Sequence, residues 1–188
     1  MIAGLVIAGL RAHSLGLLAA GGDFVADSLA LILGLFAVHL RDRHGRTHAP
    51  TYVAALNGGF LLVVTILVLV AAADRLLHQS PEVHGLPMLI VSATSAVVML
   101  IGAVILGRSA RSEDLHMRSV LLDTLSDGLS AAAVAIVGGI IYFSGGLYWL
   151  DSVVAIVVGL VIGFGASQLL RDVAQALRTK TELSVDRD

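Results

Sequence analysis

The sequence predicts an all-α membrane protein, a polytopic bundle of six transmembrane helices of which the first is shortened. The first observation is the composition, because 57% of the 188 residues are hydrophobic and only 14% are charged. The second is the mean hydropathy of +0.91. Soluble domains have about a quarter of their residues charged. The third observation is that the apolar residues form long runs, five of which reach the roughly 20 residues that a helix needs to cross a bilayer.

The five long runs follow a shorter one at the amino terminus. Residues 1–12 fall short of a span, so we expect a shortened helix there, and whether Met1 is the native start is left open. Short connections predict a single transmembrane domain over residues 1–170. Residues 171–188 are expected to form a cytoplasmic tail that continues the last helix before fraying and has no folded domain. The long runs cover residues 14–40, 52–73, 86–107, 117–143 and 147–170.

The basic residues predict how the chain is oriented in the membrane. Of the 12 Lys and Arg, only Arg11 and Arg75 fall at connections on one side, and the others fall on the opposite side or in the tail. Cytoplasmic loops carry the excess of Lys and Arg, so both termini are expected in the cytoplasm.

Composition also excludes several kinds of site and partner. The chain has no cysteine, which excludes disulfides and thiolate metal sites. The net charge is −2 and no basic tract is interleaved with aromatic residues, so nothing favours nucleic acid as a partner. The expected surroundings are the lipid bilayer.

Two pairs of aspartates lie inside the apolar runs. Asp23 and Asp27 have the same D-x-x-x-D spacing as Asp123 and Asp127, and no Lys or Arg lies between or beside either pair. This spacing places both carboxylates of a pair on one helical face, about 6 Å apart along the axis. Inserting an Asp costs about 2.5–3.5 kcal/mol, whereas a hydrogen bond between membrane helices contributes about 0.6–2 kcal/mol. Hydrogen bonds between helices therefore do not offset the cost of inserting the aspartates. We favour the interpretation that a divalent cation is held between the two pairs.

Four carboxylates around one dication would titrate as a coupled group. Metal entry would expel protons, and proton entry would expel metal. If the bundle opens this site to each side of the membrane in turn, the competition becomes antiport. The metal ion would then be a transported substrate, and no prosthetic group is expected.

The aspartate pairs and four further segments resemble the cation diffusion facilitator family of divalent metal/proton antiporters. The segments are SLGLLA at residues 14–19, AALNG at 54–58, DLHMRS at 114–119 and WLD at 149–151. The resemblance covers essentially the whole chain and implies a zinc-transporter-like exporter, expected as a homodimer. It also implies a central metal site made by Asp23, Asp27, Asp123 and Asp127.

This chain departs from the family pattern in its ligands and at its end. Zinc-transporting members commonly have histidine where this chain has Asp23 or Asp123. An all-oxygen site is harder, so zinc and manganese are both expected, and iron, cobalt and cadmium stay open. The C-terminal cytoplasmic domain usual in the family is not found in this sequence, so dimerisation is expected to rest on the membrane helices.

Other polar residues are weaker candidates. His44 and His48 have metal-ligand spacing beside Asp42, in a loop where family members often hold an accessory metal; a solvated polar loop with three nearby arginines is the alternative. Asn57 is a candidate to hydrogen-bond the aspartates, and a plain helix contact is equally open. Asp151 is expected to interact with the dipole of its own helix.

Two other function classes stay open. Intramembrane magnesium-dependent phosphotransferases also use Asp pairs, but they need cationic side chains for the phosphates, and no Lys or Arg lies within four residues of either pair. A protein that is not an enzyme is therefore expected. A membrane metal sensor, or a subunit that requires a partner, gains weight from the short first helix, and metal flux by the purified protein would discriminate it.

Overall fold

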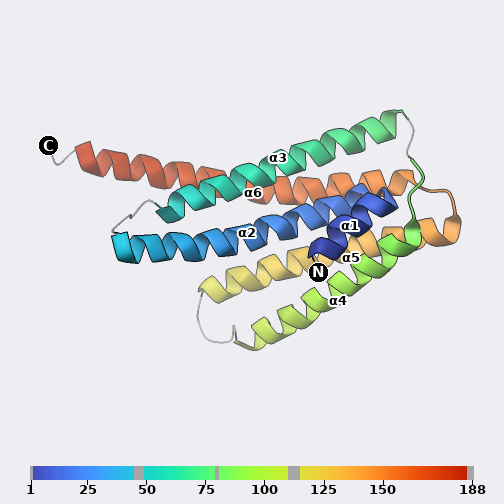
Figure 1. Cartoon of the computed structure of the whole chain (residues 1–188), viewed down its shortest axis with the longest axis horizontal. Helices are drawn as coiled ribbons and strands as arrows, with labels where there is room; N and C mark the ends of the chain where they lie inside the picture. Colours follow the sequence, from blue (N-terminus) through green and yellow to red (C-terminus); the bar gives the residue numbers. More distant parts are fainter. Residues whose placement is uncertain (1, 45–48, 79–80, 110–114, 186–188) are drawn as a thin grey trace. The chain divides into compact units, whose positions relative to one another are not determined.

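The computed structural model describes residues 2–44, 49–78, 81–109 and 115–185, and these residues form six α-helices and no strand (Figure 1). Five of the helices are long and apolar enough to cross a membrane, whereas the 11 residues of the first rise only about 16 Å. The predicted fold class, six membrane helices with a shortened first, is confirmed. The helices are α1 (Ile2–Ala12), α2 (Leu15–His44), α3 (Ala49–Leu77), α4 (Gly85–Ser109), α5 (Leu115–Ser144) and α6 (Trp149–Val185).

Several helices continue past the apolar runs that predicted them. The second ends at His44 instead of residue 40. The sixth continues past residue 170 to Val185, as expected of a tail that continues the last helix. Nine of the 15 residues from 171 to 185 are Ala, Arg, Gln, Glu, Leu or Lys, which favour helix whether or not lipid surrounds them. Hydropathy marks the lipid-embedded part of a helix, and so it underestimates the length of one that continues into water.

Most of the apolar surface of the spanning helices is not covered by the protein. Within an apolar stretch of 18 residues in each span, only 17–44% is buried. Water would solvate that surface poorly, and the hydrocarbon of a bilayer solvates it well. The protein is accordingly an integral membrane protein.

The chain forms two compact units, each built from segments distant in sequence. The first unit contains residues 1–21 and 68–158, and the second contains residues 22–67 and 159–188. Three helices, α2, α3 and α6, contribute residues to both units.

In the first unit, α4 and α5 pack along each other and α1 packs against α4 (Figure 1). Two glycines mark the closest approach of α4 and α5. A Cβ atom on Gly138 would lie 2.8 Å from the backbone nitrogen of Leu89, and one on Gly85 would lie 2.5 Å from that of Tyr142. Backbone atoms cannot move aside as a flexible side chain can, so these positions require residues without a side chain.

The second unit packs α2, α3 and α6 around small side chains. Ala26, Leu61 and Ala166 form a buried cluster, against which Ile162 packs. A Cβ atom on Gly163 would lie 3.0 Å from the side chain of Thr65, so α6 approaches α3 closely there. Small residues at helix contacts are the usual means of close packing within membranes.

Two of the described connections depend on left-handed backbone conformations. His13, between α1 and α2, has a φ of 54°, which is uncommon for a residue other than glycine. Gly145, which follows α5, has a φ of 66°, and its N–H donates to the carbonyl of Ile141 at 2.9 Å. Gly145 thus ends α5 in the way glycine ends many helices.

Candidate functional site

Asp23 and Asp27, the α2 pair, lie one helical turn apart in the second unit. Both side chains are half-buried, whereas Phe24 and Ala26 between them are buried. The pair lies within the membrane span Leu15–Phe36. The expected arrangement of two carboxylates along one face of a membrane helix is therefore present in α2.

Asp123 and Asp127, the α5 pair, have the same spacing in the first unit. Asp127 is half-buried and Asp123 is exposed. Helix α5 begins at Leu115, so Asp123 lies one turn nearer to the start of the helix than Asp127 does. The hydroxyl of Thr124, between the two aspartates, donates to the carbonyl of Val120 at 2.8 Å, within the same helix.

The two pairs belong to different units, and their convergence on one ion remains a prediction. Each pair offers two carboxylates, which are hard oxygen ligands suited to divalent cations. Two ligands rarely suffice for a dication in a protein, since zinc takes four and manganese or magnesium six. A site selective for such ions therefore needs ligands beyond either pair.

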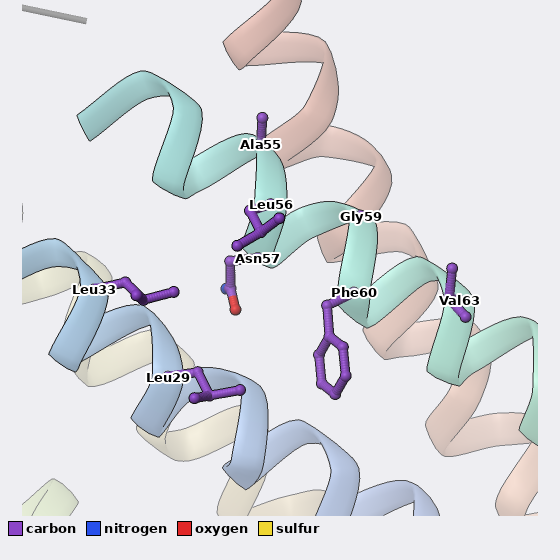
Figure 2. A pocket seen from close by; sticks show the side chains of 8 residues that line it. All are labelled: Leu29, Leu33, Ala55, Leu56, Asn57, Gly59, Phe60 and Val63. Atoms are coloured by element: carbon purple, nitrogen blue, oxygen red, sulfur yellow. The ribbon is translucent and has the colours of Figure 1, made fainter. Parts of the chain in front are cut away.

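Asn57 lines an apolar groove between α2 and α3 in the second unit (Figure 2). Figure 2 shows its amide directed into the groove, whose opposite side carries Leu29 and Leu33. The groove has a volume of about 590 Å³. Among the described residues that line it, Asn57 alone has a polar side chain; the others are Leu29, Leu33, Ala55, Leu56, Gly59, Phe60 and Val63. A hydrogen bond from Asn57 to the aspartates stays a prediction.

The residues of the expected accessory metal site fall at the end of α2 and beyond it. Asp42 and His44 belong to the last turn of α2, of which the backbone is described. His48 lies outside the described residues. The accessory site therefore also stays a prediction.

Asp151 has a role that the sequence did not predict: its carboxylate caps the start of α2. Oδ2 accepts a hydrogen bond from the backbone N–H of Leu15 at 2.7 Å. Oδ1 accepts one from the hydroxyl of Ser14 at 2.6 Å and one from the N–H of Gly16 at 3.2 Å. The side chain is fully buried. Asp151 does lie in the first turn of α6, as expected, but its hydrogen bonds are made to another helix.

Arg75, near the end of α3, completes this arrangement. Its Nη1 donates to the carbonyl of His13 at 2.7 Å and lies 3.7 Å from Oδ2 of Asp151. Ser14 carried a recognisable signal, because a serine just before an apolar run is a common helix N-cap. The partners of Ser14 carried none, because Asp151 is 137 residues away along the chain.

The comparisons with known proteins agree with one another. The family model described as the cation efflux transmembrane domain matches residues 1–178. The zinc transporter ZitB of Yersinia pestis is 30% identical over 173 residues, which cover 88% of this chain and 55% of that protein. ZitB of Escherichia coli (strain K12) is 28% identical over 190 residues, 96% of this chain and 59% of that protein. A cadmium, cobalt and zinc/H(+)-K(+) antiporter of Bacillus subtilis (strain 168) is 25% identical over 188 residues, 96% of this chain and 60% of that protein. The chain thus spans less than two-thirds of the length of these relatives.

Proposed function

Since the chain belongs to the cation efflux family, we propose that it is a secondary active transporter that exports divalent metal cations in exchange for protons. The observation that carries the proposal is the family match over residues 1–178, in a chain whose membrane spans contain two aspartate pairs. The relatives are named as zinc transporters and as a cadmium, cobalt and zinc antiporter. A divalent cation is therefore the proposed substrate.

In the proposed site, the carboxylates of Asp23, Asp27, Asp123 and Asp127 hold the ion. Neither pair alone supplies the four ligands that zinc usually takes, whereas the two pairs together do. The identical D-x-x-x-D spacing of the two pairs, each inside an apolar run, supports one ion shared by both.

Competition between metal and protons would couple transport to a proton gradient. Carboxylates bind a dication in their ionised form and not in their protonated form, so metal and protons would compete for the same oxygen atoms. Binding of the metal then releases protons, and protonation releases the metal. A proton gradient acting on a site that opens to each side in turn would drive the metal outward.

The carboxylate ligands suit more than one kind of divalent metal ion. Zinc is the proposed substrate from the names of the relatives. A site made only of carboxylates also suits manganese, and iron, cobalt and cadmium are further candidates. We propose in addition that both termini face the cytoplasm and that the protein is a homodimer.

Transport by purified protein in liposomes tests the proposal. With an imposed pH gradient, zinc uptake is expected for the wild type, with loss in Asp27→Asn and in Asp127→Asn. Asp172→Asn is a matched control, because Asp172 is an exposed aspartate in the same chain, and it should transport normally. Zinc flux that ignores the pH gradient would reject proton exchange. Flux retained in Asp27→Asn and Asp127→Asn would reject the proposed site.

The same assay separates the alternatives. A metal sensor, or a subunit that needs a partner, would bind zinc without moving it when purified alone. A phosphotransferase has less support, because the relatives are named as transporters.

The accessory site of Asp42, His44 and His48 is tested by the number of ions bound. Replacing both histidines by alanine should lower the number of zinc ions bound per chain. An unchanged number would remove this site from the proposal.

A further inference from the structure

The α2 cap, formed by Ser14, Asp151 and Arg75, satisfies every backbone donor at the start of α2. The first N–H groups of a helix have no partner within it. The N–H groups of Leu15 and Gly16 donate to the Asp151 carboxylate, and that of Leu17 donates to the Ser14 hydroxyl at 3.1 Å. The first hydrogen bond within the helix follows, from Leu18 to the carbonyl of Ser14 at 3.2 Å. The start of α2 is therefore held by α6 as well as by its own serine.

The serine and the aspartate of the cap are buried and tightly fitted. Ser14 and Asp151 are both fully buried, so water cannot replace a lost partner without a rearrangement. A Cβ atom on Gly16 would lie 3.2 Å from Oδ1 of Asp151 and 3.2 Å from the side chain of Val154. Glycine thus permits the close approach that brings the carboxylate to the N–H groups.

Arg75 fixes the connection that precedes the helix. Its guanidinium binds the carbonyl of His13, the residue with the left-handed backbone conformation, and also lies close to Asp151. A cation beside a buried carboxylate offsets the cost of burying that charge. The end of α3 and the start of α6 thereby hold the same junction between α1 and α2.

We propose that Asp151 is a positioning residue for transport, which acts through Ser14 and the start of α2 on the aspartates of that helix. This inference rests on the proposed function, in which Asp23 and Asp27 bind the metal. Asp23 is eight residues after Leu15 in one continuous helix, about 12 Å along its axis. A helix transmits an axial shift or rotation at its start over such a distance, because its hydrogen bonds make it stiff. Losing the cap would therefore misplace the α2 pair without removing a ligand.

Two buried serines allow a matched test. Ser14→Ala removes the cap hydroxyl, whereas Ser92→Ala removes a buried hydroxyl that only donates to the Met88 carbonyl of its own helix, at 2.7 Å. Hydrogen–deuterium exchange of residues 14–18 reports the cap directly, and the zinc KM and maximal rate in liposomes report positioning. Ser14→Thr keeps a hydroxyl and should restore both.

The expected result is about fivefold faster exchange at residues 14–18 in Ser14→Ala, the factor that corresponds to losing a cap of about 1 kcal/mol. The zinc KM should rise by about three- to fivefold, because the displaced pair can lose at most the energy that held it. Asp151→Asn should act in the same direction, and Ser92→Ala should change neither readout.

Three results would overturn the inference, and they differ from one another. Unchanged exchange in Ser14→Ala and Asp151→Asn would show that these residues do not hold α2. Faster exchange with an unchanged zinc KM would show that the cap is structural only. Absence of zinc transport by the wild type would reject the proposed function and with it the link to transport, while the exchange data would still report the cap.

Discussion

Replacing Gly138 by alanine should destabilise the protein, although alanine is the better helix former. The change from glycine to alanine inside a helix favours folding by about 0.5–1 kcal/mol. At Gly138 the new Cβ would lie 2.8 Å from the Leu89 nitrogen and 3.1 Å from the Met88 carbonyl carbon, both backbone atoms of α4. Overpacking of this kind costs about 1–3 kcal/mol. The cost exceeds the gain, so α4 and α5 must separate or strain.

The next residue supplies the control for this prediction. A Cβ atom on Gly139 would lie no closer than 3.7 Å to its nearest neighbour, the Cδ1 atom of Leu89, which is an ordinary contact. Gly139→Ala should therefore keep the helix-forming gain. The two variants should differ by at least about 1 kcal/mol, or about 2–4 °C in thermal unfolding midpoint for a chain of this size. Circular dichroism melts in one detergent measure the difference. Equal midpoints for the two variants would refute the packing argument.

Three further predictions concern the metal site, the contact between α3 and α6, and the α2 cap. Zinc binding measured by calorimetry should weaken as the pH is lowered, because the carboxylates must lose protons to bind metal; affinity independent of pH would contradict the competition. Gly163→Ala should lower the thermal midpoint relative to Gly165→Ala, because a Cβ at position 163 would lie 3.0 Å from Thr65 whereas none would meet an atom within 4 Å at position 165. Arg75→Gln should lower the midpoint by the equivalent of about 1 kcal/mol, because it removes the hydrogen bond to His13, and the exposed Arg11→Gln should leave it unchanged.

The fold was predictable because a membrane imposes a length on apolar runs. Each of the five long runs became a helix, and the run at residues 1–12 became the short α1. The end of α2 was less predictable, since that helix continues past its apolar run to His44, whereas the continuation of α6 through residues 171–185 was expected. The aspartate spacings likewise followed from helical periodicity, and each pair lies on one helix as expected.

The α2 cap was beyond the reach of sequence reasoning. Asp151 was expected to interact with the dipole of its own helix, and no role was predicted for Ser14. Local patterns predict which residues share one helix face. They do not predict that a carboxylate will accept a hydrogen bond from the start of a helix 136 residues away along the chain. The close approach at Gly138 was hidden for the same reason, because only the position of α4 shows why glycine is needed there.

Zinc-binding calorimetry on the purified protein tests the central claim most directly, using the wild type, the double variant Asp27→Asn/Asp127→Asn and the control Asp172→Asn. The wild type and the control should bind zinc with the same affinity, and the double variant should lose that binding, because each aspartate pair has lost one charged ligand. A double variant that is folded and binds zinc as tightly as the wild type would contradict the claim that these carboxylates hold the transported ion.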